Sequence, residues 1–222
     1  MRDLIKQEQF ELEVLDKLNS GKLLPRLVFG GGTMLRLCHG LNRYSVDLDF
    51  WIDKKIDKKK LFNGLKDLLS RSYKIKDAAY KFNTILFEIR SGSYPRSLKI
   101  EIRKKIKKVA TEQVIAYSGH SNMQVVLRSV SLADMMKAKI EAFLNRKEIR
   151  DAFDMEFLVK KGIGLEAPKG DLERLLKNLD ALTKNDYAVK LGSLLDESQR
   201  RYYVKENFKI LRSKILEKLK KY

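Results

Sequence analysis

Two aspartates spaced two residues apart carry the clearest chemical signal in the sequence. Asp47 and Asp49 lie in a stretch where polar and apolar residues alternate from Ser45 to Phe50, which is typical of a β-strand. Alternate residues of a strand share a face, so both carboxylates should point to the same side. Neighbouring carboxylates repel each other unless a cation lies between them. The spacing therefore predicts a site for Mg²⁺, with Mn²⁺ as an alternative, and an exposed acidic face is the competing interpretation.

A second signal precedes the first by about fourteen residues. Gly31, Gly32 and Thr33 separate a short apolar run at 27–29 from a helical pattern at 34–39. Glycine lets the backbone approach an anion closely, and a helix N-terminus offers unpaired N–H groups. Thr33 would cap that helix and bond a phosphate oxygen. The segment is neither a Walker A loop nor a GxGxxG loop, and a plain tight turn is the alternative.

Taken together, an anion cradle and a two-carboxylate strand form an arrangement for binding phosphate and metal. One part would hold a triphosphate, and the other would hold the cation that neutralises it. This combination is the arrangement of nucleotidyltransferases of the polymerase-β type.

The net charge and the composition indicate which classes of binding partner and which kinds of site are to be expected. Lys and Arg number 47 and Asp and Glu 29, so the chain carries a net charge of +18, which attracts polyanions such as nucleic acid. One cysteine and two histidines argue against a disulfide or a zinc site. We expect a cytoplasmic protein with no membrane association, because the start of the chain is too charged for a signal peptide and the 205–222 helix has only a modest apolar stripe.

The periodicities predict an α/β fold (α+β) with two domains. Residues 1–130 should form a small mixed sheet with flanking helices, and residues 131–222 a helical domain. The predicted strands are 27–29, 45–50, 84–90, 98–103 and 125–130. The predicted helices are 4–18, 34–39, 57–71, one from 131 onward, 150–161, and two or three within 170–222, where Phe208, Leu211, Ile215, Leu219 and Tyr222 make an apolar stripe.

Two separated blocks resemble one known family. The run Phe29–Leu37 (FGGGTMLRL) is followed by Arg43–Phe50 (RYSVDLDF), and further on Lys139–Arg146 (KIEAFLNR) is followed by Arg150–Asp154 (RDAFD). In this order the blocks resemble those of the AbiEii/AbiGii toxin family of nucleotidyltransferases. The resemblance covers roughly residues 25–160, and the tail beyond 165 carries no matching motif.

The resemblance implies roles for individual residues. Asp47 and Asp49 would bind the metal, and Gly31, Gly32 and Thr33 would cradle the nucleotide phosphates. Arg43 and Ser45 would shape the pocket. Lys139 would contact the triphosphate and Asp151 would complete the active site, the two coming from the C-terminal domain.

The residues leave some of these roles open. Glu101 is a candidate third carboxylate for the metal and for proton transfer, with Glu88 on the preceding strand as its competitor. Lys139 sits on an apolar helical face, which often marks a site, although a lysine whose charged end reaches solvent gives the same pattern. Asp151 would also serve as a first-turn helix cap.

The expected function is Mg²⁺-dependent transfer of a nucleotide from an NTP to a polynucleotide, with the 3′ end of tRNA as the family's example of an acceptor. The expected partners are tRNA or another RNA and a cognate antitoxin. Basic runs at Lys54–Lys60 and Arg103–Lys108 would follow an RNA backbone. Transfer to a protein or small molecule and a non-catalytic RNA-binding module are the alternatives. The sequence names neither the NTP nor the oligomeric state.

Overall fold

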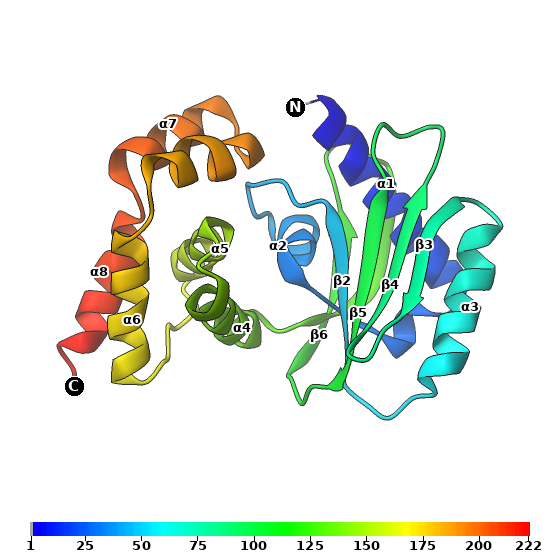
Figure 1. Cartoon of the computed structure of the whole chain (residues 1–222), viewed down its shortest axis with the longest axis horizontal. Helices are drawn as coiled ribbons and strands as arrows, with labels where there is room; N and C mark the ends of the chain where they lie inside the picture. Colours follow the sequence, from blue (N-terminus) through cyan, green and yellow to red (C-terminus); the bar gives the residue numbers. More distant parts are fainter. Residues whose placement is uncertain (1) are drawn as a thin grey trace. The chain divides into compact units, whose positions relative to one another are not determined.

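The computed structural model describes residues 2–222, which form two compact units that divide after Ser131 (Figure 1). Within these residues, the first unit holds a seven-stranded mixed sheet with helices, and the second unit is helical. The predicted α/β fold class is therefore confirmed. No helix of this described part is long and apolar enough to cross a membrane.

The first unit follows the predicted pattern with two additions. Its elements are α1 (Arg2–Ser20), η1 (Leu24–Arg26), β1 (Val28–Gly30), α2 (Gly31–His39), β2 (Asp47–Ile52), α3 (Lys58–Ser70), β3 (Lys74–Tyr80), β4 (Thr84–Arg90), β5 (Leu98–Ile106), β6 (Thr111–Tyr117) and β7 (Gln124–Val130). The sequence does not predict β3 and β6. Both are edge strands, and β3 has no buried residue, so neither shows an alternation of apolar and polar side chains.

The sheet brings the predicted site strands together. Its order is β3-β4-β5-β2-β1-β7-β6, with β2 parallel to β5 and antiparallel to β1. Leu48 and Phe50 of β2 are fully buried, whereas Asp47 and Asp49 are partly exposed. The alternation in β2 therefore separates a core face from a face that carries both carboxylates.

Helix α2 begins earlier than the sequence pattern indicates. It starts at Gly31 rather than Met34, and Gly30 occupies the N-cap position without a side-chain cap. The expected capping role of Thr33 is therefore wrong, because Thr33 lies inside the first turn. The helix ends at Gly40, whose left-handed conformation (φ 77°, ψ 32°) provides the predicted stop.

Helix α1 buries a carboxyl group in the first unit. Glu11 is fully buried, and within residues 2–222 neither of its carboxylate oxygens has a hydrogen-bond partner. Burial raises the pKa of Glu11 well above its ordinary value of 4.5, and the Glu8 carboxylate raises it further, while Arg36 acts in the opposite direction. The folded chain therefore retains a proton that the unfolded chain loses as the pH rises above 4.5.

We expect Glu11→Met to stabilise the protein, with a benefit that grows as the pH increases. Removing an unpaired buried polar group is worth about 1–3 kcal/mol, or a rise in Tm of roughly 2–12 °C for a chain of this size. Above pH 4.5 the unfolded wild type gives up the Glu11 proton, whereas the folded wild type still holds it, so the free energy of unfolding falls as the pH rises. The variant has no carboxyl group at position 11 and does not lose this stability. Thermal unfolding at pH 4.5 and pH 8 checks this, and an equal difference in Tm at both pH values would contradict it.

The second unit is assembled around buried polar contacts as well as apolar ones. Its elements are α4 (Leu132–Arg146), α5 (Ile149–Lys160), α6 (Lys169–Asp180), η2 (Asp186–Leu191), η3 (Gly192–Leu194), α7 (Glu197–Glu206) and α8 (Lys209–Leu219). Glu156 of α5 is fully buried and accepts hydrogen bonds from Tyr203 Oη (3.0 Å) and from the backbone N–H of Leu211 (3.0 Å). One carboxylate thus joins α5, α7 and the first turn of α8.

The predicted C-terminal stripe is confirmed in part. Phe208, Leu211 and Ile215 are fully buried. Tyr222 departs from the stripe, with 68% of its surface exposed, because it lies beyond the end of α8. Its hydroxyl donates to the carbonyl of Ala167 instead (3.2 Å).

Candidate active site

The turn between β1 and α2 packs directly on an aspartate of β2. Gly31 has a φ of +77°, and a Cβ built on it would overlap Asp49 Oδ2 and lie 2.9 Å from Asp49 Cβ. Gly30 is the register partner of Asp49 in the β1–β2 ladder. The sequence therefore needs glycine at position 31 both for the backbone conformation and for the space that the Asp49 carboxylate occupies.

The next glycine makes room for two polar side chains. A Cβ on Gly32 would lie 2.5 Å from Arg43 Nη2 and 2.9 Å from Ser45 Oγ. Arg43 is 2% exposed, and its Nη1 donates to the carbonyl of Tyr44 (3.0 Å). A guanidinium and a hydroxyl thus converge on the N-terminal turn of α2, where the helix dipole also favours an anion.

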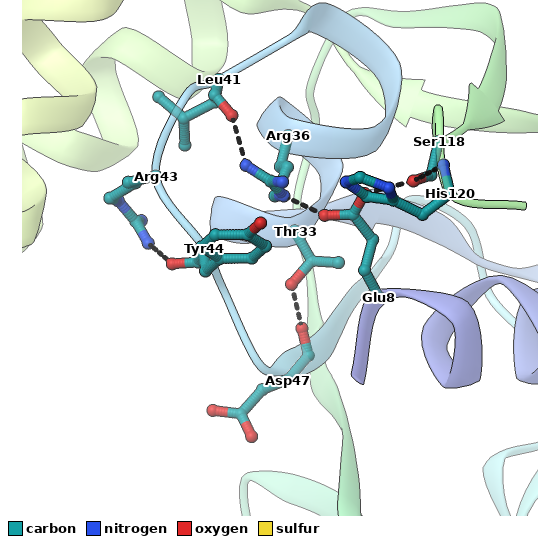
Figure 2. Close-up of polar contacts among 9 residues, drawn as sticks. All are labelled: Glu8, Thr33, Arg36, Leu41, Arg43, Tyr44, Asp47, Ser118 and His120. Carbon is teal, nitrogen blue, oxygen red and sulfur yellow. Dashed lines mark hydrogen bonds and ion pairs between the residues drawn. The ribbon is translucent and has the colours of Figure 1, made fainter. Parts of the chain in front are cut away.

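Thr33 links this turn to the metal-binding candidates. It is fully buried, and its Oγ1 donates to the carbonyl of Asp47 (2.6 Å; Figure 2). The bond ties the first turn of α2 to the start of β2. The hydroxyl therefore serves a positioning role that the sequence alone does not suggest.

The parallel pairing of β2 and β5 places the candidate Glu101 beside Asp49. Asp49 is the register partner of Glu101, and Asp47 is the partner of Lys99. The competing Glu88 lies one strand further away, on β4, where it accepts hydrogen bonds from Lys76 (2.8 Å) and Ser97 (2.6 Å). The Lys76 hydrogen bond holds the pKa of Glu88 below its ordinary value.

These oxygen donors suit a divalent cation bound together with its substrate. Mg²⁺ takes one or two protein carboxylates and fills its remaining positions with phosphate oxygens and water. In the described part of the chain, no three His, Cys, Asp or Glu side chains converge as a complete cation cage. The donor set of Asp47 and Asp49, with Glu101 in register, fits the former kind of site.

Arg36 fixes the loop that delivers Arg43 and Ser45. Its guanidinium pairs with the buried carboxylate of Glu8, donates to the carbonyl of Leu41 (3.3 Å) and stacks over the ring of Tyr44 at 3.9 Å (Figure 2). The Ser118 hydroxyl donates to the other Glu8 oxygen. The sequence shows Arg36 as part of a motif but gives no sign of its partner, because Glu8 lies in a helical pattern 28 residues earlier.

Lys139 and Asp151 belong to a second cluster, inside the helical unit. Lys139 Nζ lies 3.3 Å from Asp151 Oδ1 and 2.6 Å from Asp154 Oδ2. Arg146 binds Asp151 through both Nε and Nη2, each at 2.7 Å. Both aspartates are fully buried, and Lys139 is 7% exposed. Two cations and two carboxylates thus balance each other between α4 and α5.

The structure therefore places Gly31, Gly32, Thr33, Arg43, Ser45, Asp47 and Asp49 around the start of α2 and β2, with Glu101 in register with Asp49 on β5. Lys139 and Asp151 belong to a separate charge cluster in the second unit. The comparisons with known proteins agree with the chemistry that this first group suggests. The model of the "nucleotidyl transferase AbiEii toxin, type IV TA system" family matches residues 13–219. The chain belongs to the AbiEii nucleotidyltransferase family. As a member, it is a nucleotidyltransferase and the toxin of a type IV toxin–antitoxin system, which implies a cognate antitoxin. Nucleotidyltransferases of this family generally use an NTP and a divalent metal.

Two solved structures share the fold of this AbiEii protein. An H. pylori protein assigned as a nucleotidyltransferase has a TM-score of 0.58 and 21% identity, covering 94% of this chain and 96% of its own. JHP933 from Helicobacter pylori has a TM-score of 0.53 and 21% identity, covering 96% and 95%. A search of curated proteins gives no match. The family match extends well past residue 165, where the sequence motifs end.

Two glycines of the AbiEii protein make a matched test of the turn. Gly31 and Gly40 both have a φ of +77°, but a Cβ on Gly40 would meet nothing within 4 Å. We expect Gly31→Ala to reduce nucleotide transfer by about 100-fold or more, because displacing a reacting group by about 1 Å has that effect. Gly40→Ala should cost only about 1–2 kcal/mol of stability and keep the transfer rate. Initial rates and thermal unfolding of both variants measure this, and equal transfer rates would contradict it.

Proposed function

We propose that this AbiEii protein transfers a nucleotide from an Mg²⁺-bound NTP to the 3′ end of an RNA, with tRNA as the first acceptor to test. The single observation that carries the proposal is the convergence of Asp49, Gly31 and Gly32 with Arg43 and Ser45 at one helix N-terminus. The proposal is supported because groups suited to anion binding lie beside the Asp49 carboxylate there.

Each part would have a defined task. Asp47 and Asp49, with Glu101 beside them, would hold the cation, which supplies charge neutralisation at the phosphates and activates the attacking hydroxyl. The backbone N–H groups at Gly31 and Gly32 and the Arg43 guanidinium would bind the triphosphate. Glu101, as the register partner of Asp49, would accept the proton from the attacking 3′ hydroxyl. The 3′ oxygen would form a bond to the α-phosphorus of the NTP, the bond from that phosphorus to the oxygen shared with the β-phosphate would break, and pyrophosphate would leave.

Lys139 of the second unit keeps the role that the family resemblance implies for it, a contact with the triphosphate, and this role stays a prediction. Lys139 has three N–H donors, and its contacts with Asp151 and Asp154 use two of them. In this proposal Asp151 and Arg146 are positioning residues, because they hold the lysine in one orientation rather than touch the substrate.

The distribution of charge supports a polynucleotide acceptor. The basic runs Lys54–Lys60 and Arg103–Lys108 begin in or directly after the C-terminal parts of β2 and β5. Since these two strands are parallel neighbours, both basic runs leave the sheet at the end where β2 and β5 finish. Clustered Lys and Arg bind phosphates along a nucleic-acid backbone without reading sequence.

The experiment is a transfer assay with total tRNA, Mg²⁺ and each α-³²P-labelled NTP in turn, with parallel reactions lacking the divalent cation. Label that enters tRNA from one NTP, and only with the cation, is the expected result. Label that enters a protein or a small molecule instead would replace the acceptor in this proposal. Absence of label from all acceptors, together with absence of Mg²⁺–NTP binding by the folded protein, would overturn the proposed reaction.

A further inference from the structure

The tip of the β3–β4 hairpin presents an aromatic ring to solvent. Phe82 is 93% exposed, and its neighbour Tyr80 is 39% exposed. A phenylalanine left in water gains nothing for the fold, since burying a side chain of this size is worth about 1.5–3 kcal/mol. The exposed ring is therefore available to contact a partner, and its surroundings indicate which kind.

The hairpin tip is held in place from two sides. The backbone N–H of Lys81 donates to the carbonyl of Thr84 (2.9 Å), which closes the turn around Phe82. From β5, the backbone N–H of Lys104 donates to the carbonyl of Asn83 (2.8 Å), and its Nζ donates to the carbonyl of Lys81 (2.7 Å). A ring on such a tip is presented with little loss of conformational entropy on binding.

The charged residues in the two chain segments that form and contact the hairpin tip are all basic. Segments 80–84 and 103–108 contain six Lys and Arg residues and no Asp or Glu. Lys104 Nζ also lies 3.7 Å from the centroid of the Tyr80 ring. Exposed aromatic rings among cations are the composition of surfaces on which unpaired bases stack while lysines hold the phosphates. A duplex does not fit this description, because its bases are already stacked on one another.

The register places this tip at a useful distance from the carboxylates. Thr84 pairs with Arg103, which pairs with Trp51, two residues after Asp49 on β2. Neighbouring strands are about 4.8 Å apart and each residue advances about 3.3 Å along a strand. Over two strand spacings and about four residues, the Cα atoms of Phe82 and Asp49 are therefore about 15 Å apart. A stacked strand rises about 3.4 Å per nucleotide, so about four nucleotides would span the gap.

We infer that the β3–β4 tip, with Phe82 as its stacking ring and Lys81, Lys104 and Lys105 as its phosphate contacts, is a dock for the single-stranded end of the acceptor RNA. The inference rests on the proposed function for the presence of an RNA acceptor, and it adds where that acceptor is held. An acceptor end of about four or more nucleotides would engage the ring and the carboxylates together, whereas a shorter one would reach only the carboxylates.

Four proteins test this dock: the wild type, Phe82→Ala, Phe82→Trp and, as a matched control, Tyr117→Ala. Tyr117 is a 57% exposed aromatic residue on the opposite edge strand, β6. The probes are a fluorescent ten-nucleotide single-stranded RNA, measured by anisotropy, and the same RNA and a dinucleotide as acceptors in the transfer assay. Phe82→Ala should weaken binding of the ten-nucleotide RNA by about 5- to 100-fold and raise the KM for this RNA as acceptor, with the KM for NTP unchanged.

Phe82→Trp and Tyr117→Ala should match the wild type in RNA binding and in KM. With the dinucleotide as acceptor, all four proteins should have equal transfer rates.

The outcomes separate the two claims. Transfer to RNA by the wild type, with Phe82→Ala equal to it on the long acceptor, overturns the dock and leaves the proposed function standing. Failure of the wild type to bind or label RNA overturns the choice of acceptor, and the dock with it. Loss of binding to anionic phospholipid vesicles in Phe82→Ala, with RNA binding unchanged, would assign the tip to a membrane surface and overturn the inference.

Discussion

Asp49→Asn should reduce nucleotide transfer by about 100- to 1,000-fold, on the scale of removing one preorganised electrostatic group from an active site. Asparagine keeps the shape that fits beside Gly31 but loses the negative charge that a hard cation requires. The fold should tolerate the change, because Asp49 faces Glu101 across the β2–β5 ladder and removing one of two like charges relieves repulsion. The Tm without added metal should therefore be unchanged or higher.

The matched control for this variant is Asp77→Asn, which changes an exposed aspartate on the edge strand β3 of the same sheet. Initial rates with saturating NTP and acceptor, and thermal unfolding of each variant, give the comparison. Transfer by Asp49→Asn within tenfold of the wild type would remove Asp49 from the proposed metal site. A fall in Tm of several degrees would instead assign Asp49 a structural role.

Asp151→Ala is expected to have the largest effect on stability, a loss of about 2–3 kcal/mol, because it removes a buried carboxylate that two cations share, while Lys139 keeps its contact with Asp154. The fully buried Asp151 carboxylate binds both Lys139 and Arg146. The control is Asp171→Ala, which removes the solvent-exposed ion pair of Asp171 with Arg174 and should cost no more than about 1 kcal/mol.

The chain offers two probes for this measurement. Its single tryptophan, Trp51, lies in the first unit, so its fluorescence follows the unfolding of that unit. Far-UV circular dichroism also follows the helices of the second unit. In urea, the Asp151→Ala transition seen by circular dichroism should shift to lower denaturant, and Asp171→Ala should not shift. An unchanged circular dichroism transition would show that the charge cluster is not needed for the stability of the helical unit.

Much of this arrangement can be predicted from the sequence, because local patterns dictate it. The alternation in β2 predicts the shared face of Asp47 and Asp49, and the bounds of β4 agree with the predicted 84–90. The glycines mark the turn before α2 through their conformational freedom. The roles assigned to the site residues remain predictions, to be tested by the variants above.

The remaining features depend on contacts between distant segments, which no local pattern encodes. The bond from Thr33 to the Asp47 carbonyl and the pairing of Arg36 with Glu8 join residues from different elements. The choice between Glu101 and Glu88 depends on strand order, because both alternate with apolar neighbours in sequence. In the helical unit, the sequence shows Lys139 as a conflict on an apolar face, but only the fold reveals the two aspartates that neutralise it.

The position of β1 in the sheet has a consequence for synthesis of the protein on the ribosome. β1 lies between β2 and β7, and its pairing with β7 is parallel, so this inner strand lacks one neighbour until residues 124–130 have been made. The nascent chain would contain every carboxylate of the proposed site before its sheet could close. Non-local pairings of this kind form late. We therefore expect the proposed site of this toxin to form only after the whole first unit has emerged from the ribosome.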